Sequence, residues 1–258
     1  MNIEYHLKKD YITSLIKEGK RLDGRAFDET RPLKIQKGYA QDKACGSAYV
    51  TLGDTEVLSG ISMMTGEPYP DQPTSGVMST SAELRPIASP YFESGPPRED
   101  SIELARVIDR GIRESKSIDL DKLFIEEDKI WMVYIDLHMI NHGGNLFDAA
   151  GIAAISALLD CRMPKYEDGQ IIRGEWAGKL PMTCTPVPVT FAKIGPSIIV
   201  DATADEEYAM NARVTVTTSD TLNAMQKGGV GSFTVDEIRQ CVDQSFKIGS
   251  RLRKQVEG

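Results

Sequence analysis

Residues Trp131 to Leu159 read Trp-Met-Val-Tyr-Ile-Asp-Leu-His-Met-Ile-Asn-His-Gly-Gly-Asn-Leu-Phe-Asp-Ala-Ala-Gly-Ile-Ala-Ala-Ile-Ser-Ala-Leu-Leu. The first ten are mostly apolar and rich in β-branched and aromatic residues, which predicts a strand buried on both faces. Gly143 and Gly144 end this strand, and Asn145 is a candidate N-cap for the helix that follows. Small side chains in the helix allow a neighbouring backbone to come close: Ala149, Ala150, Gly151, Ala153, Ala154 and Ala157.

The double-glycine turn supports two interpretations. The first backbone N–H groups of a helix have no partner within it, so a strand, a glycine turn and a helix start can bind an anion. A tight turn that only leads into a buried helix explains the same residues equally well. Residues 143–146 are therefore a candidate site that sequence alone leaves open.

Composition limits the class of protein. The chain has 258 residues, 41% hydrophobic and 26% charged, which is typical of a globular protein of one large domain or two smaller ones. No run is long and apolar enough to span a membrane, and the N-terminus is no signal peptide. The net charge of −8 argues against broad electrostatic binding of nucleic acid, although a local basic strip remains possible. We expect no membrane association and a cytoplasmic location.

Cysteines and histidines give no sign of a metal or cofactor site. Cys45, Cys161, Cys184 and Cys241 lack metal-ligand spacing and are typical of reduced thiols in a cytoplasmic protein. His6, His138 and His142 are better explained as ordinary core or turn residues than as ligands. No metal and no cofactor are predicted.

The remaining chain alternates strands and helices. Helices are predicted over residues 5–20, 101–116 and 234–256, the last buried along Ile238, Val242, Phe246 and Gly249. Strands are predicted at 46–52 and 55–61 around a Gly53-Asp54 turn and at 77–84. Residues 124–125 and 130–140 are predicted to form another hairpin around Glu127-Asp128-Lys129, and further strands are predicted at 187–191, 197–201, 213–217 and 222–226. Residues 89–100 and 161–182 are predicted to be irregular. Strands followed by a helix occur twice, which predicts an α+β protein with two similar halves.

Charged residues gather in three places. The helix at 101–116 carries Arg106, Arg110 and Arg113 on one side, opposite an apolar side. These arginines form either a local basic strip or a solvated face with helical ion pairs, such as Glu103 with Arg106. The arginines of the 21–31 loop are expected to be solvated or to face a partner. Residues 205–207 (Asp-Glu-Glu) are interpreted as a solvated acidic turn.

Together these segments resemble the ribonuclease PH family, in the right order from about residue 21 to near the C-terminus. The segments that carry the resemblance are Arg21-Leu22-Asp23-Gly24-Arg25 with Glu29 and Arg31-Pro32, Gly46-Ser47-Ala48 with residues 53–58, Arg106-Val107-Ile108-Asp109-Arg110, Asp136 through Gly144, and Asp201-Ala202-Thr203 with Glu206-Glu207. The resemblance implies a phosphorolytic exoribonuclease fold of two similar halves, each a mixed sheet packed with helices, the first like domain 2 of ribosomal protein S5. It divides the chain into an N-terminal helix (1–20), a first domain (21–160), a connection (161–182) and a C-terminal domain (183–258).

The sequence departs from the catalytic pattern of that family at two places. Catalytic members follow the double glycine with a small hydroxyl residue and an arginine that hold the phosphate, whereas Asn145-Leu146 stands here. They also carry an aspartate near the position of Ala209-Met210-Asn211. We therefore interpret residues Gly143, Gly144, Asn145 and Leu146 as a degenerate phosphate site and assign no catalytic residue.

The closest resemblance is to the non-catalytic ribonuclease PH-like subunits of the archaeal exosome. It implies a hexameric ring, a trimer of heterodimers with a catalytic paralogue, to which RNA-binding cap proteins attach. It also implies that Arg106 and Arg110, with Arg113 beside them, bind single-stranded RNA on its way to 3′-to-5′ degradation. Two alternatives remain open: an active phosphate-dependent exoribonuclease, and a purely structural ring subunit without RNA contact.

Overall fold

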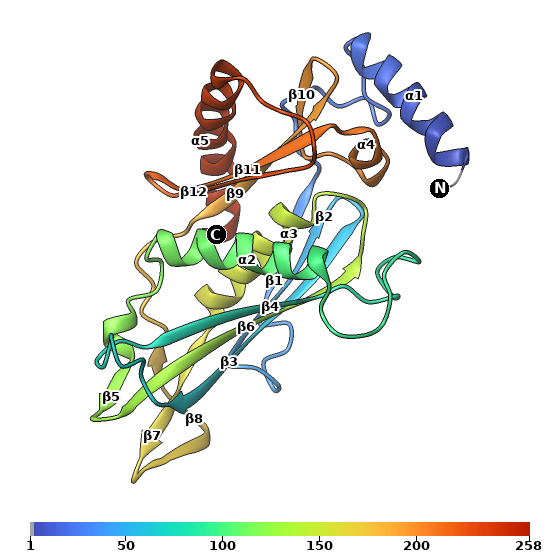
Figure 1. Cartoon of the computed structure of the whole chain (residues 1–258). Helices are drawn as coiled ribbons and strands as arrows, with labels where there is room; N and C mark the ends of the chain where they lie inside the picture. The colour runs from blue at the N-terminus through green and yellow to red at the C-terminus, as the bar shows by residue number, and fades with distance from the viewer. Residues whose placement is uncertain (1–2) are drawn as a thin grey trace.

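The computed structural model describes residues 3–258, which form a six-stranded sheet, a four-stranded sheet and a separate two-stranded hairpin, with helices between and around them (Figure 1). Side chains of residues 3–7 and of residue 173 lie outside the described part, and His6 with them. The helices are α1 (Ile3–Lys17), α2 (Glu99–Glu114), the 3-10 turn η1 (Leu120–Leu123), α3 (Leu146–Asp160), α4 (Ala204–Ala209) and α5 (Val235–Glu257). The strands are β1 (Leu33–Lys37), β2 (Gly46–Leu52), β3 (Thr55–Gly66), β4 (Val77–Glu83), β5 (Phe124–Glu126), β6 (Lys129–Asn141), β7 (Arg162–Glu167), β8 (Gln170–Lys179), β9 (Val187–Ile194), β10 (Ser197–Val200), β11 (Ala212–Thr218) and β12 (Leu222–Gly228). No described helix is long and apolar enough to cross a membrane.

The first sheet has the order β1-β2-β3-β6-β4, with β5 paired to β6. The predicted hairpin is confirmed, with Leu52 opposite Thr55 across the Gly53-Asp54 turn. β4 and β6 are parallel, which requires a crossover, and α2 provides it. The central strand β6 alternates between buried and half-buried residues. The prediction that this strand is buried on both faces was wrong, because only one face is fully covered.

The second sheet is antiparallel throughout, in the order β10-β9-β11-β12. The α+β class is confirmed, but only the first sheet is mixed. α3 and α5 cover opposite faces of the second sheet: a Cβ on Gly151 of α3 would lie 2.4 Å from Pro188 Cγ, whereas Gly249 of α5 faces Val189. Neighbouring strand residues point to opposite faces, so each helix has its own face. At Gly151 the close neighbour is the side chain of Pro188, whereas the predicted backbone approach to α3 is found at Gly46, where a Cβ would lie 2.4 Å from the carbonyl oxygen of Ala157.

Residues 161–182 were predicted to be irregular, and this prediction was wrong. They contain the hairpin β7–β8, which projects at the lower left of Figure 1. Asp168 and Gly169 form its turn, and both have positive φ, +50° and +80°. An Asp-Gly pair between strand-forming residues is a strong hairpin signal that the sequence interpretation overlooked.

Two helices pack differently from expectation. The buried stripe of α5 runs through Cys241, Ser245, Ile248, Gly249, Leu252 and Val256, whereas the predicted Ile238, Val242 and Phe246 are only partly buried. The stripe is set by the contacts of α5 with β9 and β11. At the other end of the chain, α1 packs on α4 and buries Ile12 and Ile16 in a small core with residues of the second sheet. The N-terminal helix therefore joins the second half of the molecule.

Candidate functional site

The turn between β6 and α3 is a joint between the two halves. Gly144 has a φ of +96°, and a Cβ there would lie 2.4 Å from the backbone of Thr203 and Ala204. The N–H of Ala204 donates to the carbonyl of Gly143 at 3.0 Å. Only glycine at position 144 allows the second half to come this close, and a Cβ on Gly143 would lie 2.9 Å from Asp54 Cβ in the first half.

Arg31 closes the carbonyl side of this turn. Its guanidinium donates to the carbonyl oxygens of Gly143 at 2.8 Å and Gly144 at 3.1 Å. The same group binds both carboxylate oxygens of Asp201, at 2.7 and 3.0 Å. Arg31 is buried and Asp201 is fully buried. The forked guanidinium suits this role, because it offers several donors in a fixed plane.

A second arginine of the same loop is also internal. Arg21 forms a buried ion pair with Glu206 at 2.6 Å and donates to the carbonyls of Val200 and Asp201. Arg25 adds a contact to the Asp201 carboxylate at 3.1 Å. The expectation that these arginines are solvated or face a partner was wrong, because they neutralise buried acids of the second half.

The acidic motif was also misinterpreted as a solvated turn. Only Asp205 fits that description, in a half-exposed ion pair with Lys8. Glu206 is buried as part of a capping box at the start of α4. Glu207 points to the joint, where its carboxylate accepts a hydrogen bond from the backbone N–H of Asn145 at 2.8 Å. The amide that a bound phosphate would use is thus held by an internal carboxylate.

Asn145 and Leu146 complete the filling of the turn. Asn145 is the predicted N-cap of α3, in a left-handed conformation, and its side chain accepts from the N–H of Asp148. Its amide group donates to Asp148 and to Asp201, both at 2.8 Å. Leu146 is buried in the main hydrophobic core. The four residues of the proposed degenerate phosphate site therefore lie together, and the N–H and side-chain amide of Asn145 and the carbonyls of Gly143 and Gly144 bond within the protein.

Burial and neighbouring charges shift the pKa values of the acids at this joint in different directions. Burial by itself would raise the pKa of Asp201, but the hydrogen bonds and charge of Arg31 outweigh it and lower that pKa. Burial raises the pKa of Asp148 to about 7 and that of Glu207 to about 7, despite hydrogen bonds that favour ionisation. Burial lowers the pKa of His142, with a further contribution from Arg31. Among the described residues, no three His, Cys, Asp or Glu side chains group as metal ligands do.

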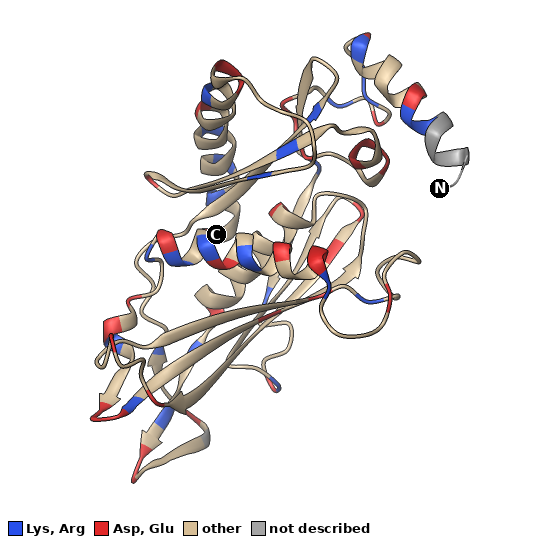
Figure 2. Cartoon of the chain, in the orientation of Figure 1, with Lys and Arg blue, Asp and Glu red and all other residues tan. Residues whose placement is uncertain are grey.

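The arginines of α2 differ in how many hydrogen bonds and ion pairs they form within the protein. Figure 2 shows basic and acidic residues interspersed along this helix. Arg106 is exposed and has neither a hydrogen bond nor an ion pair within the described part of the chain. Arg110 is exposed and donates to Gln226 of β12 at 3.1 Å. Arg113 is bound to both oxygens of Asp109 and to the carbonyl of Met78. The helical pair of Glu103 with Arg106, one of the two alternatives left open by the sequence, is not formed, because Glu103 binds Arg213 at 2.6 Å.

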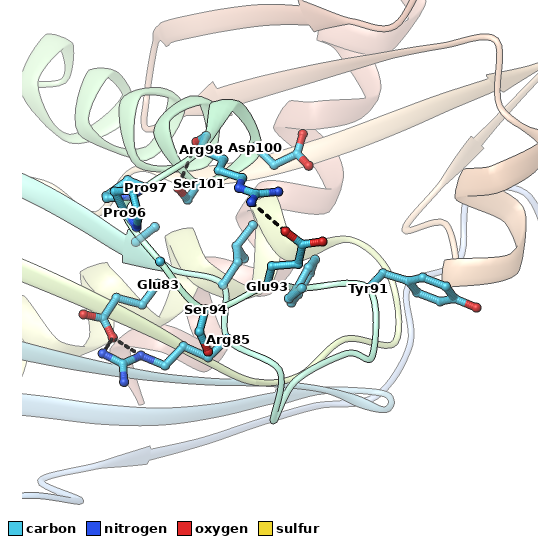
Figure 3. Close-up of a pocket in the computed structure, with 14 residues that line it drawn as sticks. Glu83, Arg85, Tyr91, Glu93, Ser94, Pro96, Pro97, Arg98, Asp100 and Ser101 are labelled. Carbon is cyan, nitrogen blue, oxygen red and sulfur yellow. Dashed lines mark hydrogen bonds and ion pairs between the residues drawn. The ribbon is translucent and has the colours of Figure 1, made fainter. Parts of the chain in front are cut away.

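A cavity of about 330 Å³ lies beside the first turn of α2, under the loop that precedes it (Figure 3). The long loop was anticipated, but not the cavity. Its two arginines are already paired: Arg85 with Glu83 and Arg98 with Glu93, both at 2.6 Å. The cavity thus has no net basic character and contributes little to an anion site.

Residues 29–164 match the family model described as "3′ exoribonuclease family, domain 1", and residues 184–248 match the model described as "3′ exoribonuclease family, domain 2". The chain is 51% identical to "Exosome complex component Rrp42" of Thermococcus gammatolerans, over 96% of this chain and 93% of that protein. It is 48% identical to the protein of that name from Methanocella arvoryzae, over 98% and 96% of the two chains.

Solved structures agree with these matches. A chain of the Archaeoglobus fulgidus exosome with RNA bound to the active site superimposes with a TM-score of 0.92 and 42% identity, covering 98% of this chain and 99% of that one. A chain of an archaeal exosome core superimposes with a TM-score of 0.89 and 40% identity, covering 99% of this chain and 98% of that one. Rice Rrp46 superimposes with a TM-score of 0.71 and 17% identity, covering 92% of this chain and 98% of that one. At this identity the likeness supports the fold alone.

Proposed function

The chain belongs to the 3′ exoribonuclease family and has the ribonuclease PH fold, and on that premise we propose that it is a non-catalytic subunit of an archaeal-type exosome ring. The observation that carries the proposal is the contact of Glu207 with the N–H of Asn145. The carboxyl group of Glu207 at 2.8 Å occupies the N–H donor of the turn and leaves no place for a phosphate there. Leu146, buried in the core beside it, offers no donor.

The partners follow from the complexes in which the similar chains were found. We propose that this chain alternates with a catalytic ribonuclease PH-like paralogue in a hexameric ring, as a trimer of heterodimers. RNA-binding cap proteins would complete the complex, and single-stranded RNA would be its substrate. We also propose the division into residues 1–20, 21–160, 161–182 and 183–258, with the β7–β8 hairpin now placed in the third segment.

The purified chain is expected to release no nucleoside diphosphate from RNA in the presence of phosphate, and mixing with the catalytic paralogue should give an active complex. Leu146→Arg by itself should not create activity, because Glu207 still occupies the amide of Asn145 and the guanidinium would enter the core. Product analysis by chromatography, with light scattering for the mass of the assembly, checks both. Phosphate-dependent turnover by the chain alone would instead favour an active enzyme.

RNA contact is the second part of the proposal. Arg106 is an exposed cation without a partner in the described structure, and the acceptor of Arg110 is a neutral amide, so both keep an uncompensated charge. Arginines presented in this way bind phosphates irrespective of sequence. Arg113 remains in the proposal as a flanking charge, but Asp109 already neutralises it.

Replacing Arg106 and Arg110 by alanine in the assembled complex is expected to weaken every single-stranded RNA alike. Each phosphate contact to a single strand adds roughly −0.7 to the slope of log affinity against log salt, so the slope should flatten by about 1.4. That corresponds to roughly tenfold weaker binding at 0.15 M salt. Fluorescence anisotropy across a salt series, with assembly checked in parallel, measures this.

The matched control removes two cations from the outer helix α5, Arg239→Ala with Lys247→Ala, both exposed. These two substitutions remove the same net charge as Arg106→Ala with Arg110→Ala. They lie on α5, which covers the face of the second sheet opposite α3. An unchanged slope in the Arg106 and Arg110 variant, or an equal change in the control, would favour a purely structural subunit.

A further inference from the structure

Arg213 of β11 lies in contact with residues of α2, α3 and β12. Its guanidinium carbon is 4.4 Å from the centroid of the Phe147 ring. On another side it lies against Gly228, where an added Cβ would be 2.5 Å from that same carbon. At its end it binds Glu103 at 2.6 Å, and the Arg213 side chain is only 14% exposed. An aromatic ring, a glycine and a carboxylate therefore fix this arginine in one place.

This placement decides the state of Arg106. Glu103 lies three residues before Arg106 on α2, a spacing at which opposite charges pair on a helix surface. Arg213 binds Glu103 instead, and Arg106 is left without a partner in the described structure. An exposed helical pair contributes little to stability, so a less exposed partner that also stacks on a ring readily competes for the carboxylate.

We propose that Arg213 is a positioning residue for RNA binding: it holds Glu103 away from Arg106 and so keeps that arginine available to a phosphate. The inference rests on the proposed RNA contact. A free Glu103 would neutralise Arg106 and compete with the phosphate for it. Arg110 needs no such device, because Gln226 orients it through a neutral oxygen that leaves its charge intact.

Gly228→Ala tests this without changing any charge. The backbone of Gly228 does not have a positive φ, and the atom that an alanine would meet is the end of a flexible side chain, so Arg213 can move while the strand stays. We expect Glu103 to turn to Arg106, the salt slope to flatten by about 0.7, and RNA to bind about fourfold more weakly at 0.15 M salt. Adding Glu103→Gln should restore the slope.

The matched control for that rescue is Asp100→Asn in the Gly228→Ala background. It removes the same charge from α2 at a position six residues from Arg106, on another side of the helix, and should not restore the slope. Arg213→Met, with and without Glu103→Gln, gives the same comparison if Gly228→Ala fails to assemble. Loss of slope without rescue by Glu103→Gln would overturn the positioning role.

Arg106→Ala in the otherwise unchanged complex separates this inference from its premise. If that variant leaves the slope unchanged, Arg106 does not contact RNA and the proposed contact itself fails. If it flattens the slope while Gly228→Ala and Arg213→Met do not, the RNA contact stands and only the role of Arg213 is wrong. Thermal unfolding of each complex shows whether a change in slope is accompanied by loss of structure.

Discussion

Replacing Arg31 by methionine is expected to lower the free energy of unfolding by about 3–5 kcal/mol. Methionine keeps most of the volume but leaves the Asp201 carboxylate buried without its main partner. The carbonyls of Gly143 and Gly144 lose a donor at the same time. Removing one member of a buried ion pair is far more destabilising than replacing both, because the remaining charge stays out of water. Urea unfolding at pH 7 measures the loss.

The matched control is Arg85→Met, which breaks the exposed ion pair with Glu83. Exposed pairs contribute about 0–1 kcal/mol, so this variant should unfold almost like the unchanged protein. Arg31→Lys should fall between them, because an ammonium keeps the charge but cannot reach both Asp201 and the two carbonyls. Equal midpoints for Arg31→Met and Arg85→Met would show that the joint does not depend on this arginine.

Asp148→Asn is expected to reduce the loss of stability that the protein shows as the pH rises from about 4 to about 7. Burial raises the pKa of Asp148 from 3.8 to about 7, so the folded state holds this proton more tightly than the unfolded state. The contribution of Asp148 to the free energy of unfolding is therefore highest below pH 3.8. It falls as the pH approaches 7, and it is constant above that. A shift of about 3 units is at most about 4 kcal/mol.

Asparagine preserves the contacts of Asp148. Its oxygen still accepts from Asn145 and from the N–H of Thr190, and its amide donates to the Thr190 hydroxyl, which is free to turn toward Thr215. Unfolding between pH 4 and pH 8 should show a smaller decline than in the unchanged protein, and greater stability at pH 8. Asp205→Asn, in a half-exposed pair, is the matched control and should leave the decline in place.

Two neighbouring acids define what remains of the pH dependence. Glu207 also has its pKa raised to about 7 by burial, and it adds a decline of the same sign. Its side chain is 23% exposed, so water reduces that share. Asp201 acts in the opposite sense: its pKa is lowered, and the stability it contributes disappears only as the pH falls below its ordinary range. An unaltered pH profile in Asp148→Asn would show that its proton is not bound more tightly on folding.

The sequence by itself determined the local elements and the family. Gly53-Asp54 identified a hairpin, Asn145 an N-cap, and the apolar spacing of residues 104–112 the buried side of α2, and the structure confirms all three. These features depend on turn geometry, capping and helical period, which a short window of sequence contains. The same is true of Asp168-Gly169, a signal that was present and overlooked.

Only the tertiary structure decided which charges meet. Arg31 and Asp201 are 170 residues apart, and Glu207 reaches the amide of Asn145 across the joint between the halves. Glu103 has a suitable partner three residues away and binds one on β11 instead. Periodicity shows which side of a helix faces a sheet, but not which distant side chain lies opposite a given charge. That choice depends on how the two sheets pack together, and here it determines whether an acid is solvated, an anion site is filled, or an arginine is free.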